Sequence, residues 1–152
     1  MINCLTEFVA TNETTNVTVP TQSAPLLLMS VFGWIIIHQN LGNTLDWQLP
    51  WVDYKDGFGS IDGNFWLGLD RMHLLTSSQA YQLRVEMQQT STSKWFSAEY
   101  WMFKIGDELN DKYRLEVSGY SGDAGDSLQY DVTATMTMTT MMMMTDVIFR
   151  EE

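Results

Sequence analysis

Three segments of alternating apolar and polar residues, joined by two short polar links, constrain the fold of this chain most strongly. They are YQLRVEM (81–87), WFSAEYWMFKI (95–105) and KYRLEVSGY (112–120). A period of two is typical of β-strands that bury one face. Because links as short as QTSTSK (89–94) and GDELND (106–111) join neighbouring antiparallel strands, the pattern predicts an antiparallel meander.

The central segment of the meander is expected to be covered on both faces. Alternation divides its apolar residues into two sets: Phe96, Ala98, Tyr100 and Met102 on one face, Trp101 and Phe103 on the other. Upstream, FGWIIIH (32–38) is rich in β-branched and aromatic residues. This composition predicts a further, buried strand.

Two short helices are predicted between these strands. The first spans Trp51–Asp56 and ends at Gly57. The second is indicated by helical spacing and two candidate caps: Phe65, Leu69 and Met72, preceded by Asp62 or Asn64. An antiparallel meander with short helices packed on it is an α+β fold.

The composition divides the chain into three parts. Residues 1–31, rich in Thr and Asn without a clear period, are expected to form a loosely ordered leader. Residues 32–131 contain the predicted strands and helices and are expected to form the folded domain. Residues 132–152 include a low-complexity tract from Thr133 to Thr145 that contains only Thr, Met and Ala, and we assign it no role.

The charge and the cysteine content exclude several kinds of partner and site. With 19 Asp and Glu against 8 Lys and Arg, the formal net charge is −11, which repels phosphate backbones, so no nucleic-acid partner is expected. The longest apolar stretch, 24–37, has fourteen residues, whereas a membrane span needs about 18. Cys4 is the only cysteine, so neither an intrachain disulfide nor a cysteine-based zinc site is expected.

Two signals bear on the cellular compartment and point in opposite directions. Asn12 and Asn16 each begin an Asn-x-Thr triplet, the acceptor pattern for N-glycosylation of secreted proteins. No charged segment followed by an apolar one opens the chain, so no signal peptide is visible. Asn12 and Asn16 are therefore candidate glycosylation sites.

Several motifs resemble those of the fibrinogen C-terminal-like domain, the globular domain of ficolins, angiopoietins, tenascins and the fibrinogen β and γ chains. The most specific are YKDGFG (54–59), FWLGLD (65–70), and SGYSG followed by AGDSL (118–128), and the resemblance covers about 33–131. It implies a structural role for ten motif residues: Gly57, Phe58, Gly59, Trp66, Gly68, Asp70, Gly119, Gly122, Gly125 and Asp126.

The resemblance also implies a function. Family members are secreted, non-catalytic binding or scaffold modules, and their partners are acetylated glycans (lectin-like, in innate immunity), extracellular matrix proteins or receptors. They usually carry an early cysteine pair and, after the last motif, a subdomain with a calcium loop and the ligand pocket. Neither is recognisable here, so we expect a truncated domain with impaired binding, no cofactor, and apolar surface that assembly with another chain would cover.

The stretch VSGYSGDAGDSLQYD (117–131) allows three interpretations. Asp123, Asp126 and Asp131 offer oxygen ligands for calcium, but they lack the alternating spacing and the closing acid of a calcium loop. The glycines do not match a phosphate-binding loop, and no Lys follows them. We therefore expect a scaffold loop in which the glycines make turns and the Asp and Ser side chains cap backbone amides.

Histidine and acidic residues supply the remaining candidate sites. His38 and His73 are too few for a zinc site, so a hydrogen-bonded structural role is expected for each. Glu86 and Glu99 lie on neighbouring predicted strands, and paired carboxylates perform glycoside hydrolysis. Glu86, however, alternates with Arg84 as solvent-facing strand residues do.

The tryptophans at 34, 47, 51, 66, 95 and 101 offer flat rings on which sugars stack. Most are expected in the core, and Trp95, beside the first link, is the one expected to be exposed. Three functions stay open: a fibrinogen-like binding or scaffold domain without enzymatic activity, which we prefer; a hydrolase that uses Glu86 and Glu99; and an incomplete product without independent function.

Overall fold

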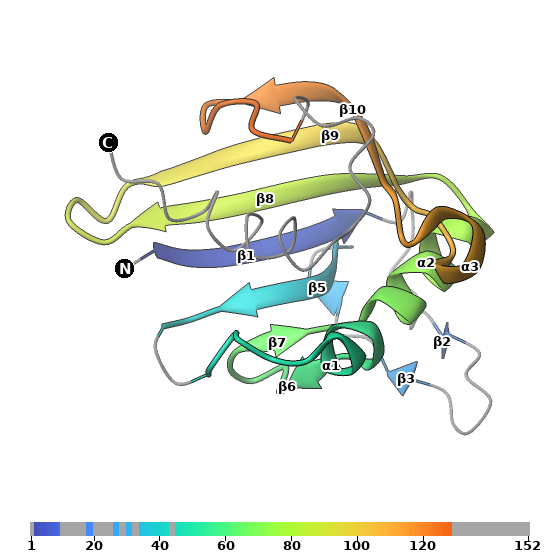
Figure 1. Ribbon diagram of the computed structural model, residues 1–152. Coiled ribbons are helices and arrows are strands. Elements are labelled where there is room, and N and C mark those ends of the chain that lie inside the picture. Colours follow the sequence, from blue (N-terminus) through green and yellow to red (C-terminus); the bar gives the residue numbers. More distant parts are fainter. Residues whose placement is uncertain are drawn as a thin grey trace.

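One antiparallel sheet organises the part of the chain that the structure describes (Figure 1). The structure, a computed structural model, describes residues 2–9, 18–19, 26–27, 30–31, 34–42 and 45–128. In sheet order its strands are β10 (Leu115–Gly122), β9 (Trp95–Ile105), β8 (Tyr81–Gln89), β1 (Ile2–Val9), β5 (Trp34–Asn40), β7 (Phe65–Trp66) and β6 (Phe58–Gly59), and β4 (Ser30–Val31) pairs with β5. A separate pair consists of β2 (Thr18–Val19) and β3 (Leu26–Leu27). Together with three short helices, the sheet confirms the predicted α+β class.

The central position of β1 differs from the loosely ordered leader expected for residues 1–31. β1 pairs with β5 on one side and with β8 on the other, from Ile2 opposite Gln89 to Val9 opposite Gln82. Both partner strands lie far away in the sequence, so no short-range pattern marks this segment as a strand. The domain limits 32–131 stay a prediction, and the tail 132–152 lies outside the described residues.

β8, β9 and β10 form the predicted meander, but a β-bulge in β9 changes which side chains face inward. The pairing of β8 with β9 skips a residue between Tyr100 and Phe103. Both of these side chains are buried, whereas Trp101 and Met102 between them are exposed. Because a bulge inserts one extra residue and shifts the alternation, the expected grouping of Trp101 with Phe103, opposite Met102 and Tyr100, is wrong.

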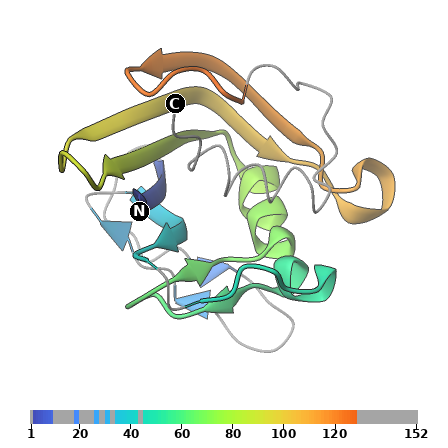
Figure 2. The same ribbon diagram turned by 60° about the vertical axis from the view of Figure 1, so that its left-hand side comes forward.

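Two of the helices lie next to each other beside the sheet. Figure 2 shows that the sheet is curved and that α2 lies on its inner side. α1 (Trp51–Asp56) has the predicted bounds. α2 (Leu69–Ser78) begins later than predicted, because Phe65 belongs to β7 and Gly68 precedes the helix with a φ of +100°.

The expected N-caps of α2 have other positions. No side chain caps this helix. Asn64 is buried and joins two backbone segments instead: its Oδ1 accepts a hydrogen bond from the amide of Leu41 at 2.7 Å, and its Nδ2 donates to the carbonyl of Gly42 at 2.8 Å. Asp62 lies in the exposed turn before Asn64. Neither cap prediction was right, because the turn connects to β5 rather than to the helix.

The link between β9 and β10, expected as a simple hairpin, contains the one-turn helix α3 (Glu108–Asp111). Asp107 caps it, since its carboxylate accepts a hydrogen bond from the amide of Asn110 at 2.7 Å. This hydrogen bond lowers the pKa of Asp107 below its usual value. Among the described residues, no helix is long and apolar enough to cross a bilayer.

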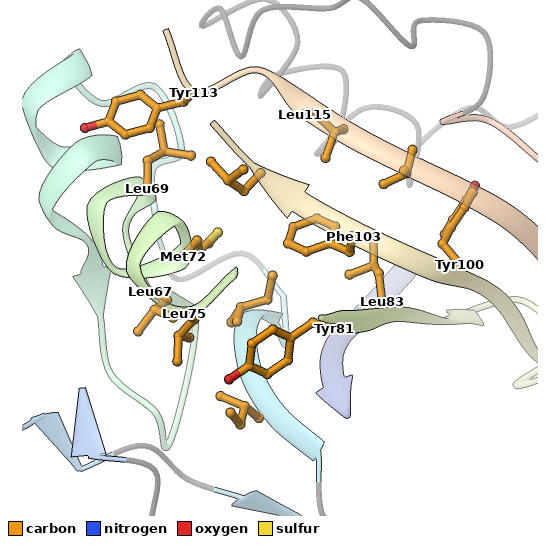
Figure 3. Packing of buried hydrophobic residues seen from close by; sticks show 14 of the residues in the cluster. Leu67, Leu69, Met72, Leu75, Tyr81, Leu83, Tyr100, Phe103, Tyr113 and Leu115 are labelled. Carbon is orange, nitrogen blue, oxygen red and sulfur yellow. The ribbon is translucent and has the colours of Figure 1, made fainter. Parts of the chain in front are cut away.

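The core lies between α2 and the inner face of the sheet (Figure 3). Leu69, Met72 and Leu75 project from α2 toward the strands and are at most 3% exposed. The sheet contributes buried side chains from β8, β9 and β10: Tyr81, Leu83, Tyr100, Phe103, Ile105, Leu115 and Val117. Hydrogen bonds fix this packing, because Thr76 of α2 accepts from the amide of Ile105 at 3.1 Å.

Candidate functional site

The last residue of β10, Gly122, and the residues after it, 123–127, fold back onto β9 through a set of hydrogen bonds, and we call residues 122–127 the Gly-Asp loop. The amide of Ser97 donates to the carboxylate of Asp123 at 2.8 Å. In return, the amides of Asp123 and Ala124 donate to the carbonyl of Ser97, each at 3.0 Å. The amide of Gly125 donates to the hydroxyl of Tyr120 at 2.9 Å. The loop therefore completes the edge of the sheet.

Asp126 of this loop accepts a hydrogen bond from the buried hydroxyl of Tyr100 at 3.1 Å. Burial, more than the neighbouring carboxylate, raises the pKa of Tyr100 well above its usual value. Asp123 and Asp126 thus each hold the loop to the sheet, and Asp131 lies outside the described residues. Within the described ranges, no three His, Cys, Asp or Glu side chains converge as a metal site would require.

The six motif glycines all have φ angles in the left-handed region: Gly57, Gly59, Gly68, Gly119, Gly122 and Gly125. At Gly122 the backbone also passes very close to β9, and a Cβ atom there would lie 2.2 Å from the carbonyl oxygen of Ser97. Any side chain at this position would break the contacts of Asp123 with Ser97.

The other two motif segments, 54–59 and 65–70, lie against each other. A Cβ atom on Gly57 would lie 2.3 Å from the carbonyl oxygen of Leu67. Arg71 joins the same two segments, because its Nη1 donates to Leu67 at 2.9 Å and also contacts the carbonyl of Asp56. The glycines of these motifs therefore allow close backbone packing rather than the approach of a ligand.

Asp70 connects α2 to the start of β10. It accepts a hydrogen bond from the hydroxyl of Tyr113, which is fully buried and has a φ of +54°. Burial and, next, the hydrogen bond to Asp70 raise the pKa of Tyr113. This contact joins residues 43 positions apart in the sequence.

We expect Tyr113→Phe to lower the free energy of unfolding by about 2 kcal/mol, because a hydrogen bond to a charged acceptor is worth about 1.5–3 kcal/mol. Asp70→Asn should lower the free energy of unfolding by less, since the amide oxygen of asparagine can still accept the hydrogen bond from Tyr113. Urea unfolding followed by tryptophan fluorescence measures both. A loss for Tyr113→Phe smaller than that for Asp70→Asn would contradict this role.

Phe58 and Trp66 belong to a cluster of aromatic rings around His38. Trp47 and Trp66 contact the His38 ring edge-on, with centroids 5.0 Å and 5.7 Å away. Tyr54 contacts both Phe58 and Trp66, and the indole nitrogen of Trp66 donates to its carbonyl at 2.8 Å. These motif residues stabilise the β5–β7–β6 side of the sheet.

The two histidines have different surroundings. His38 is 5% exposed, and its Nε2 has no hydrogen-bond partner in the part of the chain that the structure describes. The expected hydrogen-bonded role is thus not met at Nε2. Burial lowers the pKa of His38 to about 4, so the ring is neutral at neutral pH. His73, in α2, donates from Nδ1 to the carbonyl of Ile105 at 2.9 Å, as expected.

Glu86 and Glu99 lie together on the outer face of the sheet, the face that points away from α2. Arg84 lies beside both: it contacts Glu86 through Nη2 and Glu99 through Nε at 3.6 Å. Its guanidinium also lies over the ring of Trp34, 5.4 Å from the centroid. An arginine shared by two carboxylates is typical of an ion-pair network on a sheet surface, whereas glycoside hydrolysis uses two carboxylates that flank the scissile bond.

Four of the six tryptophans are buried or half-buried: Trp34, Trp47, Trp51 and Trp66. Trp95 is 50% exposed, but Trp101 is more exposed at 70%. The expected exposure of Trp95 is therefore confirmed, and Trp101 is a second exposed tryptophan. Trp101 is one of the bulge residues of β9, and the alternation of the sequence does not reveal the bulge.

Sequence reasoning missed three side-chain pairs that fix the motifs: Tyr100 with Asp126, Tyr113 with Asp70, and Lys55 with Glu108, an ion pair between α1 and α3. Each joins residues that are distant in the sequence. No periodicity reports such pairs, although a buried Tyr and an acidic motif residue each need a partner.

The architecture and the motif loops can now be compared with known proteins. A family model described as the C-terminal globular domain of fibrinogen beta and gamma chains matches residues 27–149. The chain therefore belongs to the family of fibrinogen C-terminal globular domains. The resemblance inferred from the YKDGFG, FWLGLD and AGDSL motifs is confirmed.

Individual relatives cover the same region. Fibrinogen-like protein A of Apostichopus parvimensis is 41% identical over 101 residues, 66% of this chain and 35% of the relative. Tenascin-R of Homo sapiens is 40% identical over 98 residues, 64% of this chain and 7% of the relative. The match thus spans about a third of the relative's own length, or less.

Two solved structures are also similar. The fibrinogen-like globe domain of human ANGPTL6 is 37% identical with a TM-score of 0.62, covering 64% of this chain and 43% of that globe. The corresponding globe of human ANGPTL2 is 31% identical with a TM-score of 0.65, covering 79% of this chain and 58% of that globe. The match thus spans about half of each solved globe.

Proposed function

We propose that this chain is a non-catalytic, extracellular binding or scaffold domain of the fibrinogen-like class. The observation that carries this proposal is the family match over residues 27–149. Matrix proteins, receptors or glycans are the partners that we propose, as the family resemblance implies. The unit at 32–131 is the proposed binding module, and Asn12 and Asn16 are proposed glycosylation sites of a secreted protein.

The surroundings of the reactive side chains support a non-catalytic role. Asp123 and Asp126 are engaged in hydrogen bonds to β9. Glu86 and Glu99 share one arginine. Asp123 and Asp126 thus stabilise the fold, and Glu86 and Glu99 are paired with Arg84. This arrangement favours recognition of a partner by the protein surface over catalysis.

The proposal is tested by measuring binding of the purified chain to immobilised collagen, fibronectin and laminin and to a glycan array. Each measurement is made with about 2 mM calcium and again with EDTA. Because the domain is expected to be impaired by truncation, we expect weak but saturable binding to at least one of these. EDTA should not abolish it, because no acidic cluster among the described residues could hold a metal. No binding to any of them would contradict the proposal.

The hydrolase alternative is tested on the same protein. We expect no release of nitrophenol from nitrophenyl glycosides above the buffer rate. Activity that Glu86→Gln and Glu99→Gln each abolish would overturn the proposal. The alternative of an incomplete product is tested by thermal unfolding: a cooperative transition supports a stable domain, and its absence supports the incomplete product.

A further inference from the structure

The more exposed of the two exposed tryptophans of β9 is held in a defined position on the outer face of the sheet. Trp101 is 70% exposed. It lies across Gly119 of β10, because a Cβ atom on this glycine would meet Cδ1 of the indole at 2.9 Å. The absence of a side chain at Gly119 thus makes room for the ring. One part of the indole contacts β10 and the rest faces solvent.

A carboxylate with spare acceptor capacity lies on the same face. Glu99 precedes Trp101 by two residues on β9, which places their Cα atoms about 7 Å apart. The Glu99 side chain is 46% exposed, and its ion pair with Arg84 is long, at 3.6 Å to Nε. The Nη2 of Arg84 contacts Glu86 instead. The oxygens of Glu99 therefore remain open to a further donor.

We propose that Trp101 and Glu99 form a docking site for a basic side chain, preferably arginine, on a partner polypeptide. The guanidinium stacks on the exposed indole and donates to the carboxylate of Glu99. A cation within about 6 Å of a tryptophan ring is attracted by its negative face, and the planar guanidinium also matches a carboxylate. This inference deepens the proposed binding function and depends on it.

The charge of the chain favours a basic partner segment over an acidic segment or a second copy of the chain. The chain carries a formal net charge of −11, which attracts basic segments, repels acidic ones and disfavours a second copy. The chain uses the same kind of contact internally: Arg84 lies 5.4 Å from the centroid of Trp34, and Lys94 lies 4.5 Å from that of Phe96.

The arginines of the outer face have partners within the chain. Arg84 pairs with Glu86 and Glu99, and Arg114 pairs with Asp111 and Glu116. These cations are thus largely neutralised and leave the attraction of Glu99 for an incoming cation in place. Trp101 has no cation over its ring among the described residues.

The test is a titration of the ¹⁵N-labelled chain with the peptide acetyl-Gly-Arg-Gly-amide at low salt, followed by the backbone amide resonances of β9 and β10 and by the indole N–H resonances. We expect saturable shifts of the Trp101 resonance. Trp101→Ala and Glu99→Gln should each weaken binding by up to about fivefold, since a cation–π contact and a partly exposed ion pair are each worth about 1 kcal/mol. Trp101→Phe should retain part of the affinity, because phenyl rings attract cations more weakly.

Matched variants separate this site from general attraction to an acidic protein. Trp95→Ala removes another exposed tryptophan of β9, and Glu116→Gln removes the same charge elsewhere on the outer face. Both should bind the peptide as the unchanged chain does. The inference is overturned if either control weakens binding as much as Trp101→Ala and Glu99→Gln, or if acetyl-Gly-Gln-Gly-amide shifts the Trp101 resonance equally.

Failure of this site can be distinguished from failure of the proposed function by testing Trp101→Ala against the partner that the unchanged chain binds among the matrix proteins and glycans. Full binding of that partner by Trp101→Ala, with no response to the arginine peptide, overturns the site and leaves the binding function standing. Hydrolysis that depends on Glu86 and Glu99 overturns the proposed function itself.

Discussion

Lowering the pH from 7 to 4 is expected to cost the folded chain about 3 kcal/mol through His38 alone. Burial among aromatic rings lowers the pKa of this histidine from 6.5 to about 4. The unfolded chain therefore binds a proton that the folded chain does not, and this stability is complete above pH 6.5 and lost as the pH falls toward 4. The size follows because each pKa unit corresponds to about 1.4 kcal/mol.

Urea unfolding at several pH values measures this effect. His38→Leu removes the titrating ring, so its stability should fall less between pH 7 and pH 4 than that of the unchanged chain. The difference between the two curves isolates His38 from the carboxylates, which titrate in both. Parallel curves for His38→Leu and the unchanged chain would show that His38 does not titrate as inferred.

Gly122→Ala should be among the most damaging single methyl additions, with a loss of about 3 kcal/mol or more, because a forced backbone shift adds to left-handed strain. Its φ is +127°, and the new Cβ would lie 2.2 Å from the carbonyl oxygen of Ser97. That oxygen accepts the two hydrogen bonds that hold the Gly-Asp loop to β9. The added methyl group would therefore detach the loop from the sheet.

Gly125→Ala is the matched control in the same loop. Its φ is also positive, at +87°, but a Cβ atom there has nothing within 4 Å. The expected loss is about 1 kcal/mol, the cost of a left-handed conformation alone. Differential scanning fluorimetry and urea unfolding of both variants give the comparison. Equal losses would mean that backbone conformation, and not the contact with Ser97, makes Gly122 necessary.

The sequence was sufficient for the meander, for α1 and for the family, because each leaves a local signal. Alternation marks β8, β9 and β10, and a terminal glycine marks the end of α1. The family follows from motif residues whose glycines permit unusual backbone angles. These features depend on neighbours a few residues apart, where sequence patterns are informative.

The rest of the fold and site depends on contacts between distant residues. β1 is recognisable as a strand only through β5 and β8. The bulge that exposes Trp101 arises from the pairing of β9 with β8, and no residue type announces it. The partners of Asp70 and Asp126 come from other elements, so the sequence predicts a need for hydrogen-bond donors without naming Tyr113 and Tyr100.

The insertion of β1 between β5 and β8 has a consequence for the order of assembly. β1 acquires both of its hydrogen-bonded neighbours only after β8 has been synthesised. Until then the growing chain carries an unmatched strand, and joining it means closing a very long loop, which is slow. Completion of the sheet around β1 therefore waits for strands that are synthesised much later.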